Sequence, residues 1–241
     1  MITVFKKELA SFLNSSVAWM VILVFLAGIG LPTWVFPETS VLDYGYADLT
    51  SLFTTGPWLL MFLSSAVTMK TFAEERKMGT LDMLLTRPVG DLGIVAGKFL
   101  AAWTLVFLAL LPTVTYYFSV YELGNPPGNL DTPGFLGSWL GLMLLAGVFT
   151  SFGILGSSIT NSQIVSFLVS ALLCFLMWTG WESMAEILSW ADATIIRQLG
   201  IFNHYESIGR GLIDSRDLVY FLSLIVINLT VSLTILASRK W

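Results

Sequence analysis

The sequence predicts an all-α integral membrane protein with six transmembrane helices, and three observations support that prediction. Hydrophobic residues make up 56% of the 241-residue chain and charged residues only 12%, which is about half the charged fraction of a soluble domain. Six segments reach the roughly 20 apolar residues that a bilayer core requires. None of the six contains Asp, Glu, Lys, Arg or His, each of which is costly at the centre of a spanning helix. A soluble protein with six such helices would lack the amphipathic shell that its surface needs.

The predicted spans are separated by more polar segments along the whole chain. They are Val17–Phe36, Ser51–Met69, Phe99–Tyr121, Phe135–Thr160, Ile164–Trp181 and Leu218–Ser238. Lys6 and Lys7 precede the first span, as basic residues do in a signal peptide. That span is longer than a usual signal-peptide core, however, and no A-x-A cleavage site follows it. We therefore expect a first helix that is retained.

Basic residues predict the orientation of the spans. If the N-terminus is cytoplasmic, nine of the 12 lysines and arginines lie on the cytoplasmic side. These nine are Lys6, Lys7, Lys70, Arg76, Lys77, Arg87, Lys98, Arg239 and Lys240, and the other three are Arg197, Arg210 and Arg216. Because cytoplasmic loops carry the excess of basic residues, we expect both the N- and the C-terminus to be cytoplasmic.

The first 16 residues show a helical pattern before the first span begins. Ile2, Phe5, Leu9, Phe12 and Leu13 recur at helical spacing, while Lys6, Lys7, Ser11 and Asn14 occupy the other side. This pattern predicts an amphipathic N-terminal elbow helix that lies along the inner leaflet. A disordered basic tail is the alternative, because the apolar stripe is short.

We expect one permease-like transmembrane domain over residues 1–241, with three segments outside the spans. These are the elbow helix at 1–16, a cytoplasmic loop at 70–98, and a long outer loop at 182–217. Loops as long as the last one usually have a function. Its stretch "ESMAEILSW" predicts a short helix, and we expect such helices to fold back against the outer mouth of the bundle.

Side chains for catalysis or metal binding are scarce. His204 is the single histidine, and zinc would need three or four ligands together, so we expect a polar surface residue. Glu182 and Glu186 lie one helical turn apart and are expected to form a solvated helix face. The sequence therefore predicts no catalytic residues and no metal site. It also has no basic stripe of the kind that nucleic-acid-binding proteins carry.

The stretch "LGIVAGKF" comes close to a phosphate-binding loop without matching one. That motif requires Gly five residues before its Gly-Lys pair and Ser or Thr directly after it, and these positions hold Leu92 and Phe99. We expect no ATP site in this chain. The Gly93–Gly97 and Gly137–Gly141 pairs are instead typical of helices that approach each other closely.

Ion-coupled transport is also not indicated. Ion-coupled carriers use ionisable side chains or broken helices at mid-membrane, and Pro57 and Pro112 are only possible kinks. Asn228 is the one strongly polar side chain deep in a span, and we interpret it as a link between helices rather than as a substrate ligand. Any energy that drives the protein is expected to come from another protein.

The most polar stretch is "EERKMGTLDMLLTRPVGD", residues 74–91, between spans two and three. Gly79 is expected to end the helix that leaves span two, and Thr80 can cap a new short helix. Leu81, Leu84 and Leu85 would then share one face, and Pro88 would end the helix. An exposed apolar face in the cytoplasm must be covered, either by a partner protein or by the membrane in the manner of a plain connector.

The stretch "EERKMGTLDMLLTRPV" resembles the signature that joins spans two and three in type-2 permeases of ABC transporters. In that family the segment forms a cytoplasmic coupling helix that sits in a cleft of the ATPase subunit. The resemblance carries over Glu74, Glu75, Arg76, Gly79, Thr80, Leu81, Leu84, Leu85, Thr86 and Pro88 as ATPase contacts, and Arg87 lies within the same segment. It implies a permease without its own ATP site, paired with a second permease half as a homodimer in a bacterial inner membrane, with ATP and Mg²⁺ bound by the partner ATPase.

Longer stretches, including "YELGNPPGNLD" and "HYESIGRGLIDSRDLVYFLS", resemble the gliding-motility permease subunits known as GldF. This resemblance implies an exporter-like complex with a membrane-anchored companion subunit that carries an outer domain. The alternative hypothesis is a mechanical or structural membrane component, in which the same lever acts on an outer partner and nothing is transported. A membrane enzyme is disfavoured, because charged catalytic groups are missing.

Overall fold

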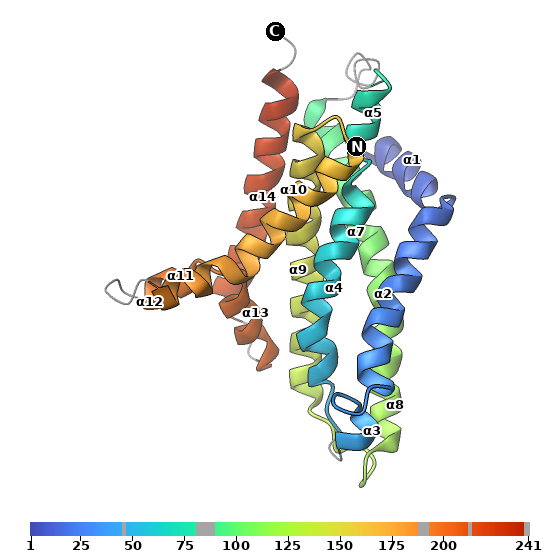
Figure 1. Cartoon of the computed structure of the whole chain (residues 1–241), viewed down its shortest axis with the longest axis vertical. Coiled ribbons are helices and arrows are strands. Elements are labelled where there is room, and N and C mark those ends of the chain that lie inside the picture. The colour runs from blue at the N-terminus through green and yellow to red at the C-terminus, as the bar shows by residue number, and fades with distance from the viewer. Residues whose placement is uncertain (45–46, 81–89, 188–192, 212–213, 239–241) are drawn as a thin grey trace.

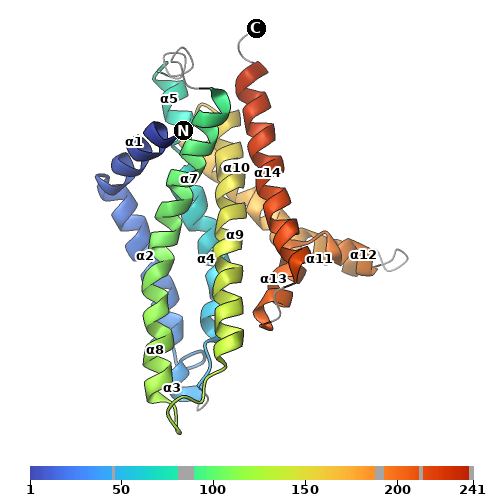
Figure 2. The ribbon, with the colours of Figure 1, turned by 180° about the vertical axis from the view of Figure 1, so that it is seen from behind.

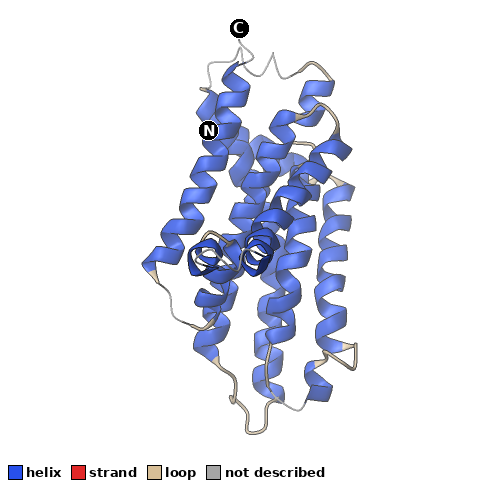
Figure 3. Ribbon diagram, turned by 60° about the vertical axis from the view of Figure 1, so that its left-hand side comes forward, coloured by secondary structure: helices blue, strands red, loops and turns tan. Residues whose placement is uncertain are grey.

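The structure is a bundle of long helices with a smaller helical projection on one side (Figures 1 and 2). It is a computed structural model that describes residues 1–44, 47–80, 90–187, 193–211 and 214–238, and these residues form helices and loops without a strand (Figure 3). The α-helices are α1 (Ile2–Leu13), α2 (Ser16–Trp34), α3 (Val41–Tyr44), α4 (Thr50–Thr68), α5 (Ala73–Lys77), α7 (Asp91–Leu110), α8 (Val114–Leu123), α9 (Thr132–Ile159), α10 (Gln163–Phe175), α11 (Trp181–Ile187), α12 (Ala193–Gln198), α13 (Ile201–Gly209) and α14 (Ser215–Ala237). A 3₁₀ turn, η1 (Leu111–Thr113), joins α7 to α8, and a π-helical turn, η2 (Leu176–Gly180), joins α10 to α11.

Six segments of the described chain are long and apolar enough to cross a membrane, so the predicted fold class is confirmed. They are Ser16–Trp34, Thr50–Lys77, Asp91–Leu123, Thr132–Ile159, Gln163–Ile187 and Ser215–Ala237. The end of α14 lies at the same end of the bundle as α1 and α5 (Figure 1). This placement is what an even number of spans requires.

The third helical segment begins earlier than hydropathy predicts. The predicted span starts at Phe99, whereas α7 starts at Asp91. Its first two turns include Lys98, which is buried against other helices. A charge that is neutralised by protein contacts does not end a helix, although it ends a run of apolar residues. Pro112 falls in η1, where a missing N–H and a fixed φ disturb the α-helical ladder.

Helix α9 is the central helix of the bundle. It packs against α4, α7, α10, α13 and α14, and most of its residues are buried. The outer helices α2, α10 and α14 leave most of their apolar side chains at least partly exposed, as expected for surfaces that face lipid. Asn228 on α14 donates from Nδ2 to Ser151 Oγ on α9 at 2.9 Å, which confirms its interpretation as a link between helices.

Small residues let the helices approach α9 closely. A Cβ atom added at Gly153 would lie 2.8 Å from Thr68 Cβ on α4, and one added at Gly141 would lie 3.2 Å from the Tyr205 ring on α13. Gly97 has the same role between α7 and α1, where an added Cβ would lie 3.0 Å from Val4 Cβ. These contacts agree with the predicted packing function of such glycines.

The long loop between α10 and α14 differs from its predicted arrangement. Helix α13 does fold back on α9, and Tyr205 donates its hydroxyl to the Phe53 carbonyl at 3.0 Å. Helices α11 and α12, however, project sideways beside the middle of the bundle (Figures 1 and 2). Met184 and Ile187 on α11 and Ile195 on α12 are exposed. Their apolar surface suits a lipid environment better than an aqueous mouth.

Candidate functional site: the Lys98 cluster

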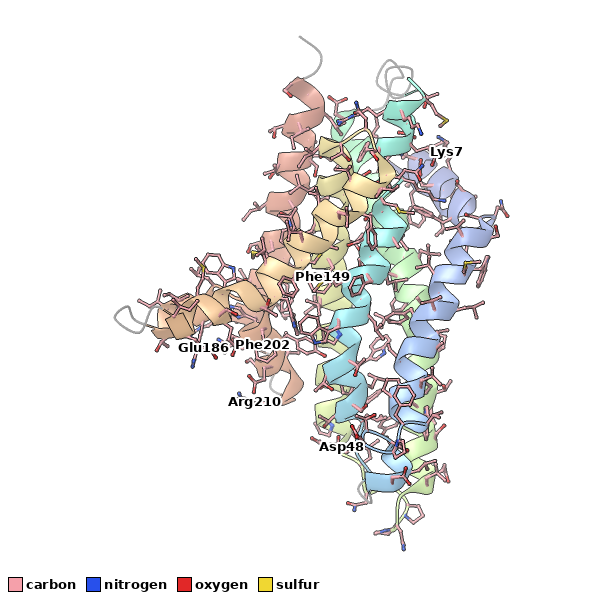
Figure 4. The ribbon with its side chains drawn as sticks, viewed as in Figure 1. Lys7, Asp48, Phe149, Glu186, Phe202 and Arg210 are labelled. Atoms are coloured by element: carbon pink, nitrogen blue, oxygen red, sulfur yellow. The ribbon has the colours of Figure 1, made fainter. Side chains whose placement is uncertain are left out.

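The charged stretch that follows span two lies where four elements meet, at the end of the bundle that carries α1 (Figure 1). These elements are α1, α5, the start of α7 and the end of α9. At their junction Lys98 of α7 contacts Glu8 of α1, Glu75 of α5 and the backbone of Thr71 between α4 and α5. These residues, together with Lys7, are called the Lys98 cluster below. Figure 4 places Lys7 beside α5.

Lys98 is the centre of the cluster. Its side chain is 1% exposed, and Nζ donates to Glu8 Oε1 at 3.0 Å, Glu75 Oε1 at 2.9 Å and the Thr71 carbonyl at 2.7 Å. The three donors of an ammonium group are therefore all used. A buried charge is tolerated only when it is paired and hydrogen-bonded, so this geometry explains how a lysine fits inside the bundle.

Two further contacts complete the electrostatics of the cluster. Lys98 Nζ lies 5.1 Å from the centroid of the Phe72 ring, within the range of a cation–π interaction. Lys7 Nζ lies 3.8 Å from Glu8 and 4.0 Å from Glu75, but its side chain is 65% exposed. The carboxylates of Glu8 and Glu75 thus lie near two ammonium groups. Of these two, only the Lys98 ammonium is buried.

Helix α5 ends as its sequence predicts. Gly79 has φ +69°, a left-handed conformation that glycine adopts without strain. The Gly79 N–H donates to the Arg76 carbonyl at 3.2 Å, and the Thr80 N–H donates to the Glu75 carbonyl at 2.9 Å. This pair of bonds is a Schellman motif, and it fixes the direction in which the chain leaves the bundle after Glu75.

The end of α9 holds the corner between α4 and α5. Ser157 Oγ accepts from the backbone N–H groups of Phe72 at 2.9 Å and Ala73 at 3.1 Å. These two donors lie where the helix bends and lack the usual carbonyl partners of a continuous helix. Arg76 Nη2 donates to the Ser158 carbonyl. The start of α5 is therefore fixed to α9 as well as to Lys98.

Helix α1 is attached to the same corner by its other residues. Val4 packs on Gly97, and Lys70 Nζ lies 3.4 Å from Ser15 Oγ and 5.7 Å from the Phe12 ring centroid. Residues Ile2–Leu13 are helical, and this helix packs across the start of α7. Its position along the inner leaflet stays a prediction.

The structure assigns positions to part of the predicted ATPase-contact segment. Glu75 and Arg76 face the bundle through the contacts above, while Gly79 and Thr80 are exposed and Glu74 is half-buried. Leu81, Leu84, Leu85, Thr86, Arg87 and Pro88 lie outside the described residues.

Sequence reasoning missed Glu8, Lys98 and Ser157. The available signal was a lysine at the edge of an apolar run, with acidic residues in the segments before span one and after span two, but the sequence alone does not show which pairs meet. His204 was expected at the surface, whereas its side chain is 16% exposed and pairs with Asp217. The sequence separates these two residues by 13 positions, so their contact was also not predictable.

The contacts of the cluster join α1, α5 and the start of α7 to one another. Among the residues that the structure describes, no group of three or more His, Cys, Asp or Glu side chains could hold a metal ion. A protein-family model described as "ABC-2 family transporter protein" matches residues 2–238. The chain belongs to the ABC-2 transporter family. No curated protein matches it.

Membership in this family gives the cluster its context. ABC-2 proteins are the multi-pass membrane components of ABC transporters and work with an ABC ATPase. The family therefore implies an ABC ATPase as a partner of this permease. The Lys98 cluster lies next to the segment that the sequence predicts as the ATPase contact.

Proposed function

We propose that the permease is the transmembrane half of an ATP-driven, exporter-like transporter and that residues 74–88 contact its ATPase. One observation supports this proposal above the others. Glu75, at the start of that segment, shares the buried Lys98 ammonium with Glu8. A displacement of the segment would therefore act on α1 and α7 directly rather than through a flexible loop.

The contacts to α9 extend the same linkage. Arg76 and the backbone at Phe72 bind the end of the central helix, and α9 packs against α4, α10 and α14. Residues 74–80 are thus joined to helices on both sides of the bundle. We propose that closure of the ATPase moves this corner as a lever, and that ATP and Mg²⁺ are bound by the ATPase and not by the permease.

The wider assembly is part of the same proposal. The resemblance to GldF subunits supports a role with gliding-motility complexes, in a bacterial inner membrane, as a homodimer with a membrane-anchored companion subunit. The basic residues support a cytoplasmic position for both termini. Vectorial transport by the reconstituted complex would distinguish a transporter from a purely mechanical component, which would turn over ATP without moving a solute.

The ATPase contact is tested with Leu84→Asp. If Leu84 is buried in an ATPase cleft, the substitution removes about 1.5–3 kcal/mol of apolar burial and adds an unpaired charge. The expected result is a loss of ATPase from the permease during co-purification in detergent, with normal levels of permease in the membrane. Asn129→Asp is the control, because Asn129 is an exposed residue of the loop at the other end of the bundle. Retention of ATPase by Leu84→Asp at the level of the control would contradict the proposed contact.

A further inference from the structure

A cavity of about 870 Å³ lies between α12, α13 and the start of α14. Figure 4 labels Arg210 at the end of α13, below the projecting helices α11 and α12 in that view. Its lining combines charged groups, including His204, Arg210, Arg216 and Asp217, with apolar groups such as Ile195. The proposed ATPase coupling does not use this cavity, so a ligand bound here would be independent of that coupling.

His204 and Asp217 form a defined pair in the wall of the cavity. His204 Nδ1 lies 2.6 Å from Asp217 Oδ1, and Nε2 lies 2.8 Å from the Gln198 carbonyl. The imidazole also stacks on Tyr220, with ring centroids 3.9 Å apart. A carbonyl oxygen can only accept, so Nε2 carries a proton.

The second carboxylate oxygen of this pair points to a ligand. Asp217 has a side chain that is 8% exposed, and its Oδ2 is buried with no hydrogen-bond partner among the described residues. His204 Nδ1 contacts Oδ1 and not Oδ2, so Oδ2 can still accept a hydrogen bond. Because an unsatisfied buried acceptor is costly, a donor group supplied by a ligand in the cavity would be favoured there.

Cationic side chains lie elsewhere on the same cavity. Arg210 and Arg216 are exposed and line it. Arg210 Nη2 donates to Glu206 at 3.1 Å, and both side chains of that pair are largely in solvent. Guanidinium groups at a rim are well suited to a phosphate. The unpartnered carboxylate oxygen in the wall fits an ammonium group, and the guanidinium groups at the rim fit a phosphate. Together they fit a zwitterion that carries both groups.

The apolar part of the lining indicates that this zwitterion is attached to a lipid. Ile195, Leu199 and Val219 line the cavity with side chains that are 60%, 48% and 65% exposed. Ile195 belongs to α12, which projects from the side of the bundle (Figures 1 and 2). Acyl chains could follow this surface away from the cavity.

We propose that the cavity between α12, α13 and α14 binds the headgroup of an aminophospholipid, with its primary ammonium on Asp217 Oδ2 and its phosphate at Arg210 and Arg216. A primary ammonium can donate an N–H to Oδ2. The quaternary ammonium of phosphatidylcholine has no N–H, and phosphatidylglycerol has no cation. A comparison of these three lipids therefore tests the contact of the ammonium with Asp217 separately from the contact of the phosphate with the arginines.

The test is lipid retention by the full-length permease in native mass spectrometry. The purified chain is exchanged into equal amounts of phosphatidylethanolamine, phosphatidylcholine and phosphatidylglycerol with matched acyl chains. We expect phosphatidylethanolamine to be retained about tenfold over phosphatidylcholine, as for a charge-assisted hydrogen bond. Asp217→Asn, which keeps the shape of the side chain, should reduce this ratio to near one. Equal retention of the two lipids by the wild type would overturn the proposal.

A second variant keeps the proposal testable if Asp217→Asn does not fold. Arg216→Gln leaves the His204–Asp217 pair intact, and it should lower retention of all three lipids without changing the preference for the primary amine. Arg197→Gln is the matched control on α12, because Arg197 is exposed and lines a separate cavity of about 120 Å³. An equal loss in Arg216→Gln and Arg197→Gln would contradict the assignment of the phosphate.

The source of the headgroup is tested by competition. Glycerophosphoethanolamine has the same ammonium and phosphate but no acyl chains. If the cavity binds a lipid, this soluble compound should not displace phosphatidylethanolamine at equal concentration. Displacement at equal concentration would show that the free headgroup is recognised, and the lipid assignment would then be wrong.

Discussion

Removal of the Lys98 side-chain charge is the perturbation that tests the Lys98 cluster most directly. Lys98→Met retains most of the apolar stem but removes the ammonium that binds Glu8, Glu75 and the Thr71 carbonyl. Breaking a buried ion pair by removing one partner costs about 3–5 kcal/mol. Glu8 and Glu75 are 12% and 15% exposed, so solvent and Lys7 can compensate them in part. We therefore expect the lower end of that range.

The expected effect is large enough to measure by thermal unfolding in detergent. One kcal/mol shifts the Tm of a chain of this size by about 2–4 °C, so a loss of about 3 kcal/mol corresponds to about 6–12 °C. Hydrogen exchange should also increase in α1, because the variant loses the Glu8 anchor. Glu206→Gln is the control, since its partner Arg210 is 69% exposed and surface pairs contribute about 0–1 kcal/mol.

A triple variant separates electrostatics from packing. Lys98→Met combined with Glu8→Gln and Glu75→Gln removes the cation together with both anions, so no buried charge is left unpaired. Replacing a whole buried network is often close to neutral, and the triple variant should recover most of the lost Tm. If the Tm of Lys98→Met equals the Tm of the wild type and of Glu206→Gln, the cluster does not hold this end of the bundle together.

Two further predictions concern packing and topology. Gly153→Val should lower the Tm strongly, because the added Cβ would lie 2.8 Å from Thr68 Cβ on α4. Gly180→Ala should be tolerated, because its added Cβ meets nothing closer than 3.8 Å. Equal Tm values for these two variants would refute the close packing of α4 and α9. In a background without the native cysteine, Asn129→Cys should react with an impermeant maleimide applied to intact cells and Lys77→Cys should not, as the basic residues predict; labelling of Lys77→Cys would reverse the orientation.

The spans were predictable because lipid imposes one simple constraint on sequence. An apolar run of sufficient length must be a helix in a bilayer, and no knowledge of its neighbours is needed. The start of α7 shows the limit of this rule. Hydropathy treats Lys98 as part of a loop, since it cannot register that two carboxylates from other segments neutralise the charge.

The candidate site was predictable only where it depends on local sequence. The glycine after "EERKM" indicated a helix end, and Gly79 does adopt the left-handed conformation. The partner of Glu75 lies 23 positions further along the chain, and that of Glu8 as many as 90. Such contacts are set by how whole helices pack. A single sequence shows which charged residues are available for such contacts, but it does not show which of these residues form pairs.

The placement of the buried charges also constrains how the permease can move. Among the described residues, Lys98 and Asp217 are the charged side chains that are almost fully buried, and both lie near the first turns of their helices. Lys98 is bound by α1 through Glu8 and by the α4–α5 corner through Thr71 and Glu75. Separating either element from α7 would leave a buried charge without its partner, at several kcal/mol.

Helices α1 and α5 and the start of α7 are therefore expected to move together when the ATPase acts on them. The deformation is then expected elsewhere in the bundle. The α-helical hydrogen bonding is interrupted at two positions outside the cluster: the short connection at Asn14 and Ser15, between α1 and α2, and the 3₁₀ turn at Leu111–Thr113, between α7 and α8. If the bundle bends at these two positions, a movement of the Lys98 cluster would be carried to the far end of α2 and to α8. The same buried lysine that makes the corner costly to break would thereby determine which part of the bundle responds.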